Sequence, residues 1–212
     1  RVARVTVELV RPVPLDELRS EVEIVRPGKR VQLVAARLYA GEDLVVRALA
    51  LRLRRDGASA APASEPAAAE AVGPEQARPL RLEHVQPGLP MFNHDGVDVR
   101  YARGDWGVGS AFAWIALRKP VIDGEQPTPL QRALAAADFG NGVSAAVDWS
   151  AWAFINPDLT VYLERDPVGP WVGLDAQTRV GPDGTAVAES VLHDEQGRIG
   201  RAVQALLIEP RA

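Results

Sequence analysis

Two stretches of the chain alternate apolar and polar residues with a period of two, which is typical of β-strands with one buried face. The first stretch contains four such runs: Val5–Leu9, Val22–Ile24, Leu33–Leu38 and Val45–Leu53. Pro27-Gly28 and Gly41-Glu42-Asp43 lie between runs and supply residues that favour tight turns. The pattern therefore predicts a set of antiparallel strands over residues 1–55.

The segment 159–211 repeats this layout at a constant distance along the chain. Thr160-Val161 follows Thr6-Val7 by 154 positions, and Arg201-Ala202 follows Arg47-Ala48 by the same number. A constant offset shared by separate strands indicates an internal duplication. Chance similarity between short strands is the alternative interpretation.

A helix is predicted before the second set of strands. Thr128-Pro129-Leu130-Gln131 contains a capping box with proline at the first helical position. We expect this helix to run from Pro129 to Phe139 and to end with Gly140 in the left-handed conformation. By the same offset, its counterpart in the first copy, together with the preceding strand, would lie before residue 1, within roughly 45 residues.

Residues 56–79 differ in composition from the rest of the chain. Ala, Pro, Glu, Ser and Gly dominate, and large apolar side chains are almost absent, so the segment has little surface to bury. We therefore predict three parts: strands of a first unit over 1–55, a linker over 56–79 and a second unit over 80–212.

Composition and charge argue against several classes of function. The 212 residues are 47% hydrophobic and carry a net charge of −4, so a globular core is expected and nucleic-acid binding is not. Cysteine is absent and His84, His94 and His193 lack metal-ligand spacing, which predicts neither a metal nor another cofactor. The absence of cysteine favours a reducing cytoplasmic location. No apolar run approaches roughly 20 residues, so no membrane partner is expected.

Two later runs and the end of the chain carry a family resemblance. They are 129–142, which contains Ala137-Asp138-Phe139-Gly140-Asn141-Gly142, then Phe154–Val161, and the ending Asp194–Gln204. They resemble the C-terminal hotdog of proteins related to acyl-CoA thioesterase II, by motif over 104–211 and by strand pattern over 1–55. The resemblance implies an α+β double hotdog, with two antiparallel sheets each wrapped around a central helix and the first copy lacking its N-terminal strand and helix. It also implies fatty-acyl thioesters of coenzyme A or of an acyl carrier as substrates.

The resemblance further implies three polar site positions that together orient a water molecule. The family has an Asp at the end of the helix, a Thr on the following strand and a Gln on the last strand. Asp138 and Gln204 match the first and the last of these. Counting back from Asp148 places the Thr position at Ala146, so we expect Ser144 or Asn141 to supply the missing contact.

The residues themselves support a special role for Asp138 and Gln204. Asp138 shares a helix face with Leu134 and lies in the last turn, where the helix dipole disfavours an anion. Gln204 lies in a strand that is apolar on both faces, so its amide requires a partner, and its counterpart in the first copy is Ala50. Purely structural roles, with both groups bonded to nearby backbone, are the alternative.

Three functions follow in order of support. The first is a thioesterase that cleaves fatty-acyl thioesters to a free acid and a thiol. The second is a non-catalytic protein that binds or scaffolds acyl thioesters, which Ala146 favours. The third is a hotdog dehydratase or hydratase, which ranks last because no histidine base follows Asp138 at the required spacing. Apolar edge strands and five tryptophans also suggest a homodimer.

Overall fold

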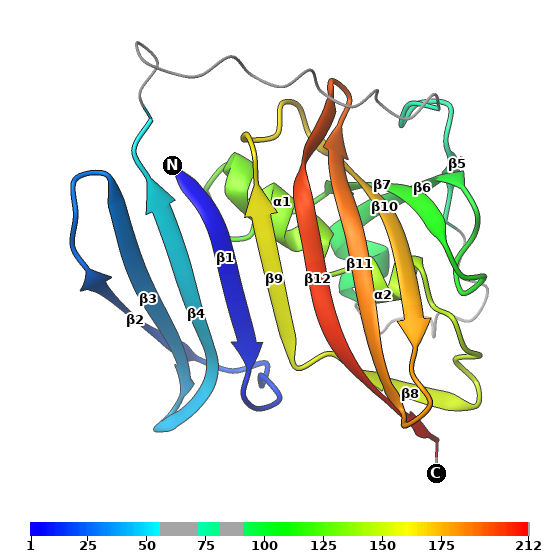
Figure 1. Cartoon of the computed structure of the whole chain (residues 1–212), viewed down its shortest axis with the longest axis horizontal. Coiled ribbons are helices and arrows are strands. Elements are labelled where there is room, and N and C mark those ends of the chain that lie inside the picture. Colours follow the sequence, from blue (N-terminus) through cyan, green and yellow to red (C-terminus); the bar gives the residue numbers. More distant parts are fainter. Residues whose placement is uncertain (56–71, 81–90, 212) are drawn as a thin grey trace.

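A computed structural model describes residues 1–55, 72–80 and 91–211. Its strands form one antiparallel sheet in the order β2-β3-β4-β1-β9-β12-β11-β10-β7-β6-β5, and β8 pairs with part of β12 (Figure 1). The strands are β1 (Val2–Leu9), β2 (Leu18–Arg26), β3 (Val31–Ala40), β4 (Asp43–Leu53), β5 (Arg78–Pro79), β6 (Val97–Arg103), β7 (Ala111–Leu117), β8 (Trp152–Ile155), β9 (Asp158–Leu163), β10 (Trp171–Val180), β11 (Thr185–Asp194) and β12 (Gly197–Pro210). The helices are η1, a single π-helical turn (Phe92–Gly96), α1 (Pro129–Ala137) and α2 (Gly140–Val143).

The two halves of the sheet meet where β1 pairs with β9. Thr6 lies opposite Thr160, and the hydroxyl of Thr160 donates a hydrogen bond to that of Thr6 over 3.2 Å. On either side, Val5 faces Val161 and Val7 faces Leu159. Leu159 is the counterpart of Val5 and Val161 is the counterpart of Val7, so the offset of 154 converts one flanking pair into the other. The two strands are therefore related by a local twofold axis through the threonine pair.

The same offset holds in the neighbouring ladders. Val34 of β3 pairs with Ala50 of β4, and Ala188 of β11 pairs with Gln204 of β12. Both members of the second pair lie 154 positions after those of the first. The repeat read from the sequence is therefore also a repeat of strand register.

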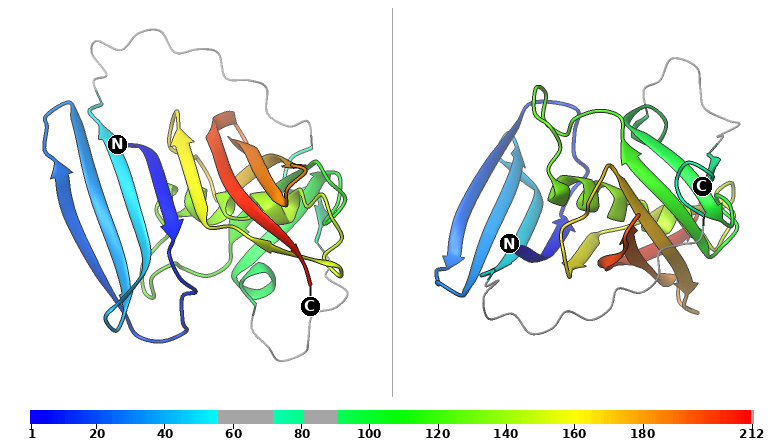
Figure 2. Two further views of the ribbon diagram at one scale, coloured as in Figure 1. Left: turned by 60° about the horizontal axis from the view of Figure 1, so that its bottom comes forward. Right: turned by 90° about the horizontal axis from the view of Figure 1, so that it is seen from above.

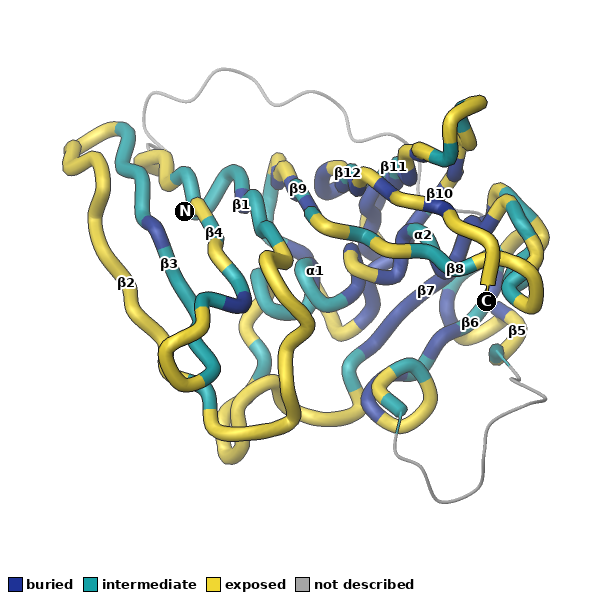
Figure 3. The backbone as a smooth tube through the Cα atoms, turned by 90° about the horizontal axis from the view of Figure 1, so that it is seen from below, coloured by how far each residue is buried: buried dark blue, intermediate teal, exposed yellow. Residues whose placement is uncertain are grey.

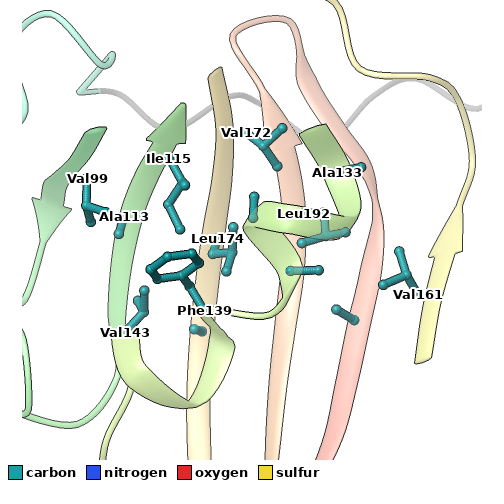
Figure 4. Packing of buried hydrophobic residues seen from close by; sticks show 14 of the residues in the cluster. Val99, Ala113, Ile115, Ala133, Phe139, Val143, Val161, Val172, Leu174 and Leu192 are labelled. Atoms are coloured by element: carbon teal, nitrogen blue, oxygen red, sulfur yellow. The ribbon is translucent and has the colours of Figure 1, made fainter. Parts of the chain in front are cut away.

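Helices α1 and α2 cover one face of the second half of the sheet. Both contact β7, β10 and β11, and the sheet curves around them (Figure 2). The core lies between them, where Phe139 at the junction of the two helices packs near Leu174 and Ile115 of the sheet (Figure 4). Small residues of α1, such as Ala133, are fully buried and let the helix approach the strands closely.

The predicted start of α1 is confirmed, and its predicted end is wrong. Thr128 accepts a hydrogen bond from the Gln131 backbone N–H over 3.3 Å, and the Gln131 side chain accepts one from the Thr128 N–H over 2.7 Å. The helix stops at Ala137, and Gly140 begins α2 without a positive φ. Glycine is needed there for space, because a Cβ would lie 3.0 Å from both Gln204 Oε1 and Ser190 Oγ.

The first half of the sheet carries no helix within residues 1–55, all of which are described. Its outer strand, β2, has exposed apolar side chains. Val22 and Ile24 of β2 are 70% and 57% exposed, respectively, and β2 is exposed along most of its length (Figure 3).

The C-terminal part of the predicted linker, residues 72–79, is ordered. Residues 56–71 lie outside the described part of the chain, but 72–80 pack onto the second half. The indole N–H of Trp114 donates to the backbone oxygen of Val72 over 2.9 Å, and Ala77 is buried beside the same ring. The short strand β5 then pairs with β6. The large buried indole thus anchors a segment that composition alone marked as unstructured.

Within the described ranges, no helix is long and apolar enough to cross a membrane.

Candidate active site

The candidate site lies where β12 changes its strand partner. Val203 pairs with Thr160 of β9, whereas Leu207 pairs with Ile155 of β8. Residues 204–206 fall between these two ladders. The chain crosses this interval through Asn156 and Pro157, which connect β8 to β9. The sheet is therefore opened locally on one side of Gln204.

Gln204 projects from this interval into the protein and is 1% exposed. Its Oε1 accepts a hydrogen bond from the backbone N–H of Asn141 over 3.2 Å. Its Nε2 lies 3.4 Å from both Oδ1 and the backbone oxygen of Asp138. The buried amide thus has the partners that its burial requires.

Asp138 occupies the C-cap position of α1 and is the meeting point of two amides. Its Oδ1 accepts from Asn156 Nδ2 over 3.3 Å and from Gln204 Nε2, whereas no group of the described residues donates to Oδ2. The residue as a whole is exposed, although neighbouring protein atoms lie close around its carboxyl group. Burial raises the pKa of Asp138, and the hydrogen bond from Asn156 partly opposes that rise.

Asn156 is the residue that the sequence comparison missed. In the family, the Thr position lies two residues before an aspartate. Counting back from Asp148 gives Ala146, which lies on an exposed loop after α2. The same count from Asp158, at the start of β9, gives Asn156, whose side chain contacts Asp138. The sequence signal that points to Asn156 is the run Asn156-Pro157-Asp158, whose last residue begins β9.

Ser144 and Asn141 have different positions from those expected. Ser144 is fully buried, and its Oγ donates to the Gly140 backbone oxygen over 2.9 Å and lies 2.8 Å from Thr178 Oγ1. It therefore fixes the end of α2 to β10 and has no hydrogen bond with Asp138. Asn141 contributes to the site through its backbone N–H.

A hollow lies beside α2 on the exposed loop that carries Ala146. It has a volume of about 530 Å³, and its walls include the stacked rings of Trp106 and Trp149, whose centroids are 5.8 Å apart. Trp106 also packs against Gly142 of α2. Two other tryptophans, Trp114 and Trp171, are buried in a separate cluster. Among the described side chains, no group of three or more His, Cys, Asp or Glu could hold a metal ion.

Sequence profiles of known families match nearly the whole chain. The profile of the acyl-CoA thioesterase N-terminal domain matches residues 1–53, and that of the acyl-CoA thioesterase C-terminal domain matches residues 56–208. The chain belongs to the acyl-CoA thioesterase family. The C-terminal match includes Asn156 and all four predicted site residues, which are Asp138, Asn141, Ser144 and Gln204.

Solved structures support the hotdog fold of this acyl-CoA thioesterase family member. A proposed thioesterase II of Thermobifida fusca matches with a TM-score of 0.73 and 18% identity, over 98% of this chain and 78% of its own. A hot dog protein of unknown function from Alicyclobacillus acidocaldarius matches with a TM-score of 0.70 and 17% identity, over 100% and 80%. Acyl-CoA thioesterase II TesB2 of Mycobacterium marinum matches with a TM-score of 0.62 and 16% identity, over 100% and 82%. A comparison with curated protein sequences gave no significant match.

Proposed function

We propose that this protein hydrolyses fatty-acyl thioesters of coenzyme A, with Asp138, Asn156 and Gln204 orienting the attacking water. Family membership supports acyl-thioester hydrolysis as the general activity. The observation that carries the mechanism is the convergence of two side-chain amides on one oxygen of a carboxylate whose other oxygen accepts no hydrogen bond from the described residues.

The carboxylate of Asp138 acts as the base or as the anchor of the water. Asn156 and Gln204 hold Oδ1, which leaves Oδ2 to accept a hydrogen bond from the water. Because burial raises the pKa of Asp138, its basicity lies closer to neutral pH than that of an exposed aspartate, which improves general-base catalysis. The water then attacks the thioester carbonyl, and the thiolate leaves without a strong acid because thiols have a moderately low pKa.

The mechanism explains why one half of the duplicated sheet is sufficient. Gln204 is replaced by Ala50 at the equivalent position of the first half, so the amide is present once per chain. We therefore extend the proposal to a double hotdog architecture, in which β1–β4 belong to a first unit that completes the sheet and the second unit carries the chemistry. The predicted homodimer stays a prediction.

The test is thiol release by the purified protein from straight-chain acyl-CoAs of several lengths, followed with a thiol-reactive dye. The proposal predicts turnover with saturation by at least one chain length. The non-catalytic alternative predicts saturable binding, measured by calorimetry, without thiol release. Binding of every acyl-CoA with no release from any of them would overturn the proposed hydrolysis.

A further inference from the structure

Asp158 closes the gap in the strand ladder beside the candidate site. It is the first residue of β9, and its Oδ1 accepts a hydrogen bond from the backbone N–H of Ala205 over 2.7 Å. Ala205 follows Gln204 directly, in the interval of β12 that pairs with neither β9 nor β8. A side chain therefore replaces the strand partner that this N–H lacks.

The first half of the sheet shows what the ladder is like without this opening. There, β1 and β4 stay paired through Val5–Ala50 and Arg4–Leu51. The offset of 154 turns the second of these pairs into Asp158–Ala205, which the β9–β12 ladder does not contain. The opened ladder and the carboxylate that bridges it thus occur together, in the half that holds Gln204.

The position of Asp158 links both amides of the site. It lies two residues after Asn156, and its hydrogen bond fixes the backbone next to Gln204. The intervening Pro157 is itself held, because its backbone oxygen accepts from the Leu9 N–H over 2.8 Å. One carboxylate therefore joins the segment that carries Asn156 to the strand that carries Gln204.

A negative charge at this position has an electrostatic cost. Asp158 lies directly opposite Glu8 across the β1–β9 pair, and like charges at opposed positions destabilise a sheet. Arg47 is hydrogen-bonded to Glu8 and offsets part of this cost. What the geometry requires of residue 158 is the acceptor oxygen, which an asparagine also provides.

We propose that Asp158 is a positioning residue that sets the spacing between Asn156 and Gln204 and so holds both amides on Asp138. The inference rests on the proposed hydrolysis. Asp158 itself touches neither the water nor the thioester in this account. Its hydrogen bond to Ala205 is short and well placed, whereas the contacts to Asp138 are 3.3–3.4 Å long and depend on how the two segments are held.

The test compares Asp158→Ala and Asp158→Asn with Asp183→Ala. Asp183 is the matched control, because it also accepts from a backbone N–H, that of Thr185, but in the β10–β11 turn. Asp158→Ala should lower kcat by about 10- to 100-fold with little change in KM, since misplaced groups impair the reaction more than binding. Asp158→Asn should recover most of the activity, and Asp183→Ala should retain it. If Asp158→Ala does not fold, Asp158→Glu replaces it, with the carboxylate moved by one methylene and a similar loss of kcat expected.

A second readout separates this inference from the proposed function. In NMR spectra, Asp158→Ala should shift the Gln204 side-chain amide signals and speed hydrogen exchange of the Ala205 amide, and Asp158→Asn should do neither. If the wild type releases no thiol, the proposed function fails and the NMR comparison alone decides the positioning role. Unchanged Gln204 signals in Asp158→Ala, or equal losses of kcat in the Ala and Asn variants, would overturn it.

Discussion

The side-chain nitrogen of Gln204 lies 3.4 Å from Oδ1 of Asp138, although 66 residues separate the two in sequence. The contact exists because the end of α1 lies over the interval in which β12 changes partner from β9 to β8. Asn156, on the segment that crosses this interval, reaches the same oxygen. The opening in the sheet and the polar cluster are thus one structural feature.

The pH dependence of turnover should report the hydrogen bond between Asn156 and Asp138. This bond lowers the pKa of Asp138, so its loss in Asn156→Ala should raise that pKa further above the usual value. If the carboxylate form is the active one, the acid limb of kcat/KM against pH should move to higher pH in this variant. Asn93→Ala, which alters an asparagine of the turn η1, should leave the limb where it is.

A limb that stays in place or moves to lower pH in Asn156→Ala would show that this amide does not act on the ionisation of the catalytic group.

Gly140→Ala should impair activity by crowding the amide of Gln204. The added Cβ would lie 3.0 Å from Gln204 Oε1 and from Ser190 Oγ, so these neighbouring groups must move by a few tenths of an ångström, which disturbs the placement of the Gln204 amide. Gly142→Ala is the matched control on the same helix, because its Cβ would meet the ring of Trp106 at 2.8 Å instead. We expect both variants to lose about 1–3 kcal/mol of stability in thermal unfolding, with the larger fall in kcat for Gly140→Ala.

Equal kcat values for the two glycine variants, at matched losses of stability, would contradict a role for the exact placement of Gln204.

Much of this architecture follows from the sequence, because its signals are local or periodic. Alternation of apolar residues gives the strands, the capping box at Thr128 gives the start of α1, and the offset of 154 gives the repeated register. The family resemblance indicates Asp138 and Gln204, and the position of each as a polar residue in an apolar pattern supports that assignment.

Asn156 could not be found in this way, since it lies in a turn where an asparagine is unremarkable. The third polar position of the family lies two residues before an aspartate. Counting back from Asp148 gives Ala146 and counting back from Asp158 gives Asn156, and the spacing alone does not choose between them. The end of α1 was misjudged for a related reason. A glycine after a helix usually permits a positive φ, but Gly140 is required by the close approach of Gln204 from a distant strand.

The stability of the second half should depend on pH through Asp194. This fully buried carboxylate is hydrogen-bonded to Arg165 and accepts from the backbone N–H groups of Val168 and Gln196. Burial acts to raise the pKa of Asp194, but these hydrogen bonds outweigh it, so the pKa lies below its usual value. The associated stability is therefore present above the usual aspartate pKa of about 3.9 and is lost as pH falls through the lower folded-state value.

Asp194→Asn should accordingly reduce the free energy of unfolding at pH 7 by about 3 kcal/mol, since it leaves Arg165 without its anion. The loss should stay nearly constant from pH 7 down to about the usual aspartate pKa of 3.9 and shrink as denaturant titrations are carried to lower pH. Asp183→Asn, at an exposed turn, should change the free energy of unfolding much less. A pH-independent difference between Asp194→Asn and the wild type would contradict the assignment.

The most direct test of the catalytic account is thiol release by Asp138→Asn, measured beside acyl-CoA binding by calorimetry. The substitution keeps the size of the side chain and an oxygen for Asn156 and Gln204, but it removes the charge that holds the water. We predict that kcat falls at least about 100-fold while the dissociation constant for acyl-CoA changes less than about threefold. Turnover at the wild-type rate in this variant would contradict the mechanism.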